Sequence, residues 1–142
     1  RGLFVPFFGR LASTYKSIGL LAMQFKCPVI CGMARRLPEP NFRYQLDIQD
    51  VIRPEDWAGA EDPLFYLTAR YRRAIESAVR EAPGQYLWMH RIWKSRPRHE
   101  RLGRAFPGSL EAKLRALPWM TEDELARIKA QSALDAGALS TA

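Results

Sequence analysis

The two histidines are the first residues to consider as a catalytic base, because imidazole changes its charge near neutral pH. A histidine base also needs a carboxylate nearby to orient it. The residue five positions after His90 is Ser95, and the residue five positions after His99 is Arg104. Neither histidine has a carboxylate at that spacing, so we predict no catalytic residue within this chain.

Other signatures of catalysis and of metal binding are also missing from the sequence. It contains no Gly-x-Ser-x-Gly nucleophile elbow and no glycine-rich phosphate loop. The two histidines lie nine positions apart, and Cys27 and Cys31 have no further cysteine to complete a ligand set. We predict that both cysteines are reduced core residues, and that the chain holds no metal and no cofactor.

One candidate binding segment runs from Val5 to Thr14. Here a predicted strand leads Gly9 and Arg10 into a turn ahead of a helix N-terminus. The guanidinium of Arg10, the hydroxyls of Ser13 and Thr14, and backbone N–H groups of the turn are groups that hold a phosphate or a headgroup. The alternative is an ordinary strand-to-helix turn with a capping hydroxyl.

A second candidate segment, residues 86–97, interleaves aromatic and basic side chains. Tryptophan and tyrosine favour the boundary between water and lipid, and nearby cations meet anionic headgroups. A core strand or helix with a solvated basic edge fits the pattern equally well. Arg35 and Arg36 either extend the basic surface or are simply solvated. The members that we single out are Tyr86, Trp88, His90, Arg91, Lys94 and Arg96.

The overall charge favours an anionic partner. The 142 residues carry 22 Lys+Arg against 15 Asp+Glu, a net charge of +7. Phospholipid headgroups, nucleic acid and a phosphorylated substrate all match that charge. No apolar run approaches the roughly 20 residues that a membrane-spanning helix needs, since the longest, Ile18 to Phe25, is interrupted by Gly19 and Gln24.

The predicted elements that position these residues give an α/β fold with a mostly parallel or mixed sheet flanked by helices. The first strand begins without a lead-in, so we expect the sheet to be incomplete at its N-terminal side. Residues 1–97 are predicted to be the C-terminal part of a domain, and residues 98–142 a basic loop and a helical tail that is an appendage or frayed. The exposed basic stretch itself is expected to begin at Lys94, just before this boundary, and to end at Pro107. The expected strands are 3–8, 29–34 and 42–48, and the expected helices are 13–26, 62–82, 109–117 and 121–136, with a breaker at Pro38–Pro40.

Three ordered motifs resemble the family of lipid A biosynthesis lauroyl/myristoyl acyltransferases. Residues 7–14, Phe-Phe-Gly-Arg-Leu-Ala-Ser-Thr, are similar to the family's Phe-Phe-Gly-x-x-Ala-x-Thr stretch. Residues 27–30, Cys-Pro-Val-Ile, resemble its Ala-Pro-Val-Val strand. Residues 86–97 resemble its closing motif, Tyr-x-Trp-x-His-Arg-Arg-Phe/Trp-Lys-x-Arg-Pro. The departures are Leu11, where the family often has proline, and Ile92, where it often has arginine.

The resemblance implies an acyltransferase that moves a fatty acyl chain from a thioester, on acyl carrier protein or coenzyme A, to a hydroxyl of a glycolipid or lysophospholipid. In the family a histidine with a carboxylate five residues later is the base, and an N-terminal hydrophobic helix anchors the enzyme at the cytoplasmic face of the bacterial inner membrane. Both features are expected upstream of Arg1, so we expect this chain alone to be inactive. Arg10, Ser13 and Thr14 are then candidate substrate contacts.

Two other functions remain open from the residues. One is a basic nucleic-acid-binding module that uses the arginines and lysine with the tryptophans, although the resemblance leads us to expect no nucleic acid. The other is a non-catalytic relative that keeps a lipid-binding surface without the chemistry.

Overall fold

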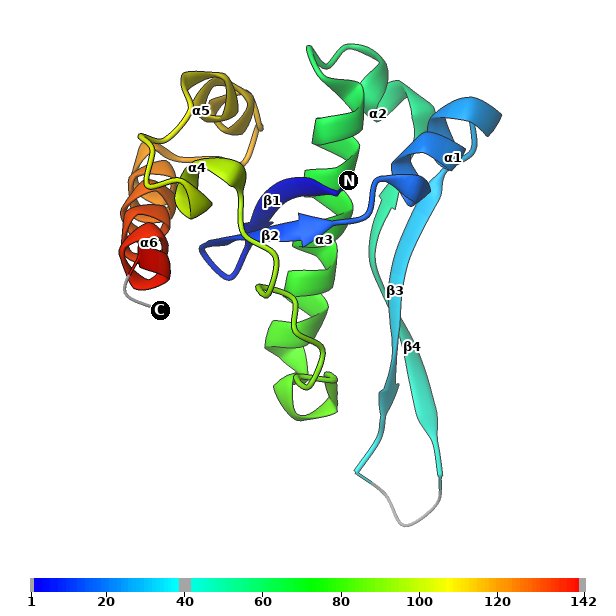
Figure 1. Ribbon diagram of the computed structural model, residues 1–142. Helices are drawn as coiled ribbons and strands as arrows, with labels where there is room; N and C mark the ends of the chain where they lie inside the picture. The colour runs from blue at the N-terminus through cyan, green and yellow to red at the C-terminus, as the bar shows by residue number, and fades with distance from the viewer. Residues whose placement is uncertain (1, 39–41, 141–142) are drawn as a thin grey trace. The chain divides into compact units, whose positions relative to one another are not determined.

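The computed structural model describes residues 2–38 and 42–140 and divides the chain into two compact units (Figure 1). The terminal unit combines residues 1–15 with residues 92–142, and the central unit comprises residues 16–91. The predicted α/β class with a helical C-terminal tail is confirmed. The predicted boundary at residue 97 stays a prediction.

The terminal unit consists of a β-hairpin and three helices. Strand β1 (Leu3–Phe7) pairs antiparallel with strand β2 (Arg10–Thr14), with Phe7 opposite Arg10. The helices are α4 (Arg98–Arg101), α5 (Gly108–Arg115) and α6 (Glu122–Ser140). Helix α6 packs against β2 and α4 (Figure 1), which joins the two ends of the chain in one unit.

The turn between β1 and β2 corrects the predicted strand-to-helix turn. Phe8 and Gly9 both have positive φ, 51° and 70°. Positive φ at both central residues is the geometry of a type I′ turn, whose twist reverses the chain into a tight hairpin. The expected strand 3–8 is therefore followed by a second strand, and Ser13 and Thr14 lie in β2 instead of capping a helix.

Helix α6 corrects the expectation of an appendage or frayed tail. The predicted capping box is present, because Glu124 N donates to Thr121 Oγ1 (3.1 Å) and Thr121 N donates to Glu124 Oε2 (3.2 Å). One face of the helix is buried at helical spacing. Its buried residues are Leu125, Ile128, Ser132 and Asp135.

The predicted exposed loop 94–107 is also only partly correct. Arg96, Pro97 and the two central residues of α4, His99 and Glu100, are buried. Charged side chains are buried at acceptable cost only when they are paired, and the pairs are formed with α6, as described below. Lys94 and residues 101–105 are exposed, as the prediction required.

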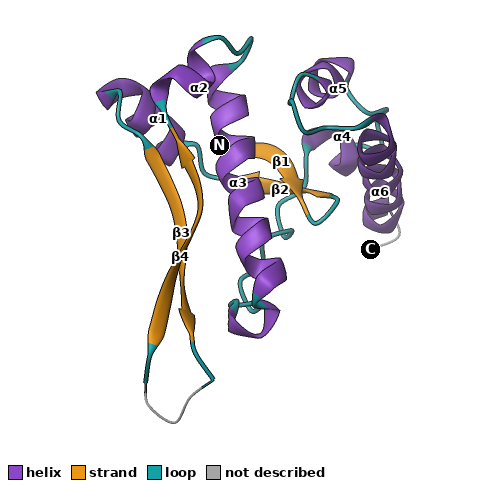
Figure 2. Cartoon of the chain, turned by 180° about the vertical axis from the view of Figure 1, so that it is seen from behind, coloured by secondary structure: helices purple, strands orange, loops and turns teal. Residues whose placement is uncertain are grey.

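The central unit places a long helix beside a β-ribbon. Helix α3 (Pro63–Glu81) begins at the predicted N-cap, where the Asp62 side chain accepts a bond from Phe65 N at 2.9 Å. It lies along the antiparallel ribbon of β3 (Val29–Arg36) and β4 (Tyr44–Ile52), as Figures 1 and 2 show from opposite sides. The remaining elements are α1 (Ser17–Phe25), α2 (Pro54–Ala58) and the 3-10 turn η1 (Pro83–Gln85).

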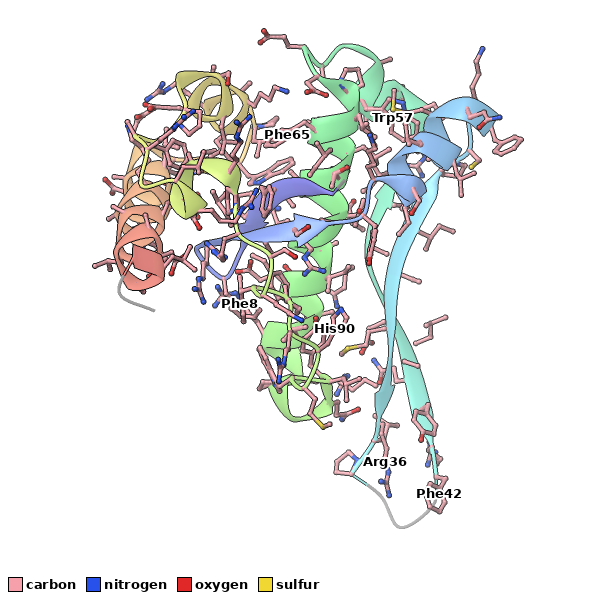
Figure 3. The ribbon with its side chains drawn as sticks, in the orientation of Figure 1. Phe8, Arg36, Phe42, Trp57, Phe65 and His90 are labelled. Carbon is pink, nitrogen blue, oxygen red and sulfur yellow. The ribbon has the colours of Figure 1, made fainter. Side chains whose placement is uncertain are left out.

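The core of the central unit forms where α1, α2 and α3 meet the base of the ribbon. It consists of Ala22, Ile52, Trp57, Leu67 and Tyr71, and Figure 3 shows Trp57 among these elements.

Gly19 lets α1 approach α3 closely, because a Cβ there would stand 2.8 Å from Leu64 Cδ1. Both cysteines are free, as predicted. Cys27 is nevertheless exposed, which corrects its core assignment, because the chain leaves the helix through the left-handed residue Lys26 (φ 50°).

The ribbon confirms the strands predicted at 29–34 and 42–48 and extends both. Among the residues that the structure describes, the four strands form two separate antiparallel pairs, not one mostly parallel or mixed sheet. Short reversals between consecutive strands favour this pairing, since parallel neighbours need a long crossover. Residues 39 and 40 of the predicted breaker lie outside the described residues.

Candidate functional site

The most highly organised polar cluster lies in the terminal unit, and we name it the arginine centre: Arg10, Arg96, Glu100, Ser132 and Asp135. Its hub is Arg96, whose side chain is 5% exposed. The guanidinium of Arg96 donates to both carboxylate oxygens of Glu100 (2.7 and 3.0 Å) and to Asp135 Oδ2 (2.6 Å). It also donates to the backbone carbonyl of Leu11 at 2.7 Å. One side chain thus joins β2, α4 and α6.

Arg10 lies at the edge of the centre, where β2 begins after the type I′ turn. Its Nε and Nη2 donate to the two carboxylate oxygens of Asp135, both at 2.7 Å. The guanidinium also stands 5.9 Å from the centre of the Trp93 ring, within the range of a cation–π contact. Because its side chain remains 36% exposed, Arg10 is held in place and still reaches solvent.

The charge of Asp135 is fixed by its neighbours. Burial acts to raise the pKa of this carboxyl, but hydrogen bonds from Arg10 and Gln131 and the charge of Arg96 outweigh it and lower the pKa. Asp135 is therefore ionised at neutral pH. Its single charge is shared between two guanidinium groups, one buried and one partly exposed.

A histidine, a serine and a carboxylate also meet in this unit. His99 Nε2 lies 2.9 Å from Ser132 Oγ, and that hydroxyl donates to Glu100 Oε1 at 2.6 Å. Burial lowers the pKa of His99, partly opposed by the charge of Glu100. All three side chains are buried, so a substrate has no access to the hydroxyl. The trio is a structural network and has no geometry for nucleophilic catalysis.

The structure does not bring the three candidate phosphate contacts of β2 together. Thr14 is buried, and its hydroxyl is 3.4 Å from the carbonyl of Ala12. Four residues along a strand separate it from Arg10 by roughly 13 Å. Ser13 is half-buried and points to the opposite face of the strand from Arg10 and Thr14. The substrate contacts of Arg10, Ser13 and Thr14 stay a prediction, without the helix N-terminus that motivated it.

The aromatic and basic segment 86–97 is divided between the two units. Its first part, Tyr86–Arg91, forms turns that follow α3 in the central unit. Tyr86 and Trp88 stack edge to face at 5.0 Å, and Trp88 Nε1 donates to the carbonyl of Pro83 at 2.7 Å. His90 and Arg91 are exposed, and Figure 3 shows His90 beside the lower half of α3.

The second part of this segment, Ile92–Pro97, belongs to the terminal unit. Ile92 is buried, the Trp93 ring packs 5.8 Å from that of Phe7, and Lys94 is exposed. The closing motif is therefore exposed at His90 and Arg91 and buried at Arg96, which belongs to the arginine centre. Neither a regular strand nor a regular helix forms along it.

The central unit contains a cavity of about 180 Å³ between α3 and the ribbon. Its walls are largely apolar, and the small side chains of Ala74 and Ala78 leave the space open. Burial, assisted by the charge of Asp50, raises the pKa of the Cys31 thiol in its wall to about 11. This thiol is therefore protonated at neutral pH and is a poor nucleophile.

Residues 2–38 and 42–140 offer neither a cluster of metal ligands nor a helix suited to span a membrane. No group of three or more histidine, cysteine, aspartate or glutamate side chains there is arranged to hold a metal ion. Among the helices of these described residues, none has the length and apolar character required to cross a membrane.

Glu100, Ser132 and Asp135 of the arginine centre were not predicted from the sequence. A local signal for them existed, since Arg96 and Glu100 are four residues apart, and Ser132 and Asp135 are three apart on one helix face. The pairing of Asp135 with Arg10 had no such local signal, because the two residues are 125 positions apart.

Comparisons with known proteins agree with the motifs. The model of the family described as bacterial lipid A biosynthesis acyltransferase matches residues 1–95. A lipid A biosynthesis lauroyltransferase of Escherichia coli (strain K12) is 29% identical over 96 residues, which are 67% of this chain. The chain spans 30% of the length of that relative. No solved structure matches the chain significantly.

Proposed function

Because this chain belongs to the bacterial lipid A biosynthesis acyltransferase family, we propose that its parent protein transfers a fatty acyl chain from an acyl thioester to a hydroxyl of a glycolipid or lysophospholipid. The donor is the thioester of acyl carrier protein or coenzyme A, and no metal or cofactor takes part. The observation that carries the proposal is the family match over residues 1–95, which contains the first candidate binding segment and residues 86–95 of the second.

In this proposal the catalytic histidine and its carboxylate belong to the parent protein outside residues 1–142. Neither histidine of the chain suits the role. His99 is buried with Ser132, and the ring of His90 has no hydrogen bond or ion pair with any residue that the structure describes. A general base requires both access to the hydroxyl and an orienting partner. The chain alone is then a binding part of the enzyme and is inactive by itself.

Arg10 is the substrate contact that the geometry supports best. Its Nε and Nη2 bind Asp135, whereas Nη1 makes no hydrogen bond to a described residue and the side chain reaches solvent. A guanidinium fixed in this way presents donors to a phosphate at little further entropic cost. Exposed Arg91 and Lys94 supply charge for an anionic membrane surface, and we place the parent at the cytoplasmic face of the bacterial inner membrane.

The test is acyl transfer by the full-length parent, with a labelled acyl thioester and a lysophospholipid or glycolipid acceptor. Arg10→Ala is expected to reduce kcat/KM at least tenfold, chiefly through KM, because it removes donors to a charged substrate. Arg10→Lys retains the charge but not the paired geometry with Asp135, so it should recover part of the activity. Arg80→Ala, on an exposed position of α3, is the matched control.

Three outcomes would contradict parts of this proposal. Unchanged turnover in Arg10→Ala removes Arg10 from the substrate site. A parent that binds anionic liposomes and transfers no acyl chain is the non-catalytic lipid-binding relative. Salt-sensitive binding to oligonucleotides without binding to liposomes is the signature of the nucleic-acid-binding module.

A further inference from the structure

Asp135 holds Arg10 by a contact that leaves part of the guanidinium open. Its two carboxylate oxygens accept from Arg10 Nε and Nη2, both at 2.7 Å. A guanidinium carries one N–H on Nε and two on each Nη, so both N–H groups of Nη1 and one of Nη2 have no hydrogen-bond partner among the described residues. The remaining N–H of Nη2 and one N–H of Nη1 point the same way along one edge of the planar group. Such an edge binds two oxygens of a phosphate at once.

The carboxylate of Asp135 is held by other residues as well. Its Oδ2 also accepts from Arg96 Nη2 at 2.6 Å, and its Oδ1 also accepts from Gln131 Nε2 at 3.1 Å. The side chain of Asp135 is 7% exposed and that of Arg96 is 5% exposed. Asp135 belongs to α6, which packs against β2 and α4 (Figure 1). The orientation of the Arg10 guanidinium therefore depends on a helix near the opposite end of the sequence.

The indole of Trp93 gives Arg10 a second contact. Its ring centre lies 5.9 Å from the guanidinium carbon, and the ring packs 5.8 Å from that of the buried Phe7. A cation–π contact uses the charge of the guanidinium and consumes no hydrogen-bond donor. Arg10 is therefore oriented by two contacts that leave the donors on Nη1 available.

The contact between Arg10 and Asp135 is of limited value for stability. The Arg10 side chain is 36% exposed, and ion pairs that reach solvent contribute little to folding. Without Arg10, Asp135 keeps the guanidinium of Arg96 and the amide of Gln131 as partners. The contact does restrict a long side chain, whose freedom is otherwise lost when a ligand binds. These features favour a role of the contact in binding over a role in folding.

We propose that Asp135 is a positioning residue for Arg10, which it holds so that the remaining N–H groups of the guanidinium bind the phosphate of the acyl acceptor. The inference rests on the proposed function, and it extends the substrate site to α6. Residues 96–142, and with them Asp135, lie beyond the stretch that the family model matches. A determinant of acceptor binding is thus located outside the part of the chain by which the family is recognised.

The negative charge of Asp135 acts in the opposite direction, because an anion beside Arg10 weakens the attraction of the guanidinium for a phosphate. Arg10 reaches solvent, where water and salt weaken such charge effects. The freedom that a side chain loses on binding is not screened by salt. Positioning is therefore expected to outweigh neutralisation, and the two effects shift KM in opposite directions when Asp135 is removed.

The test is steady-state acyl transfer by the full-length parent to a phosphate-bearing lysophospholipid. Asp135→Ala is expected to raise KM for this acceptor about threefold to tenfold, the cost of ordering one long side chain, with kcat unchanged. Asp135→Asn retains an oxygen that accepts from Arg10, so it should raise KM less. When Asp135→Ala is added to Arg10→Ala, KM should not rise further, because Asp135 acts only through Arg10.

Ile128→Ala is the matched control for a purely structural effect of α6. Ile128 is buried on the same face of the helix, about two turns before Asp135, and it takes no part in the polar contacts of Arg10. It should lower the urea midpoint and leave KM for the acceptor unchanged. A KM that rises in Ile128→Ala as it does in Asp135→Ala would overturn the proposal. So would an unchanged or lowered KM in Asp135→Ala, or effects of Arg10→Ala and Asp135→Ala that add in the double variant.

A second measurement does not need turnover. Phenylglyoxal modifies guanidinium groups, and its rate at Arg10 is followed by peptide mass spectrometry with inorganic phosphate as the protecting probe. Phosphate should protect Arg10 in the parent, and in Asp135→Ala the concentration for half protection should rise by a similar factor. Absence of protection in the parent, or equal protection in both proteins, would overturn the inference. A parent that shows the expected protection and transfers no acyl chain would disprove the proposed function alone.

Discussion

The molecule contains two β-hairpins, and they differ in how completely they are packed. In β1–β2, Val5, Phe7 and Leu11 are at most 1% exposed, and the backbone of β2 is bound by the buried Arg96. In β3–β4, the strands are longer and carry Leu46 and Ile48 in the open. Hairpin formation alone therefore does not create a core. The first hairpin is bound by residues from the C-terminal part of the chain, whereas the second leaves large apolar side chains exposed.

The largest effect is expected from removing Arg96, the buried side chain that binds the backbone of the first hairpin. Arg96→Ala leaves Glu100 as a buried anion without its guanidinium partner and leaves Asp135 paired with Arg10 alone, and loss of one member of a buried ion pair costs about 3–5 kcal/mol. We expect that decrease in the free energy of unfolding, measured by urea denaturation. Arg70→Ala is the comparison in the central unit, since Arg70 also binds two carboxylates but its side chain is 22% exposed. A loss in Arg70→Ala as large as in Arg96→Ala would contradict the assigned difference in burial.

The next test compares one leucine from each hairpin. Leu11→Ala removes a buried side chain and is expected to cost about 2–5 kcal/mol. Leu46→Ala removes an exposed one, and in the 142-residue chain it should change stability by less than about 0.5 kcal/mol. Denaturant midpoints at constant slope measure both. A loss of stability in Leu46→Ala as large as that in Leu11→Ala would contradict the difference in burial between the two hairpins.

A smaller effect is expected at the turn of the first hairpin. Gly9 has φ of 70°, a region that costs an L-residue with a Cβ about 1–2 kcal/mol. Gly9→Ala should therefore lower the melting temperature by a few degrees. Phe8→Asn should instead raise the melting temperature, because asparagine tolerates the positive φ of 51° better than phenylalanine does. If both variants have the same melting temperature as the unmodified chain, the type I′ turn is not the conformation in solution.

The smallest effect is a pH dependence that arises in the terminal unit. Because burial lowers the pKa of His99 below its ordinary 6.5, the unfolded chain takes up the proton first as the pH falls. Stability from this group is complete above about pH 6.5 and declines as the pH falls through that value, by at most about 1.4 kcal/mol per pH unit. Urea midpoints at pH 8 and pH 5.5 measure it.

Two variants control this measurement. His99→Gln should remove the decline while keeping a hydrogen bond to Ser132, and His90→Gln, at an exposed histidine, should retain it. Asp135 does not interfere, because its lowered pKa gives stability that is lost only below about pH 4. If stability still declines to the same extent in His99→Gln as the pH falls, the decline arises from another group.

Local signals explain what the sequence could predict. The cap at Asp62 and the capping box at Thr121 are both present, because each involves residues only three positions apart. The β3–β4 strands were also predictable from alternation. The alternation did not reveal which face of the ribbon α3 covers, since that depends on contacts between segments far apart in the sequence.

The arginine centre could not be predicted in the same way. In the sequence, Arg96 is one of several cations in a basic stretch. Its partners are far away in the chain, because Leu11 is 85 residues and Asp135 is 39 residues from it. The hairpin turn was missed for a different reason. The sequences Asn-Gly and Asp-Gly usually indicate a type I′ turn, whereas here Phe8 occupies the first central position of the turn, where φ is positive.

The bond between Arg10 and Asp135 has a consequence for the order in which the molecule folds. The two residues are 125 positions apart, so the terminal unit cannot close until nearly the whole chain has left the ribosome. All contacts within the central unit lie inside residues 16–91, and shorter loops close at lower entropic cost. During synthesis the central unit is therefore expected to fold first. The β1–β2 hairpin is expected to become packed only after α6 has been synthesised.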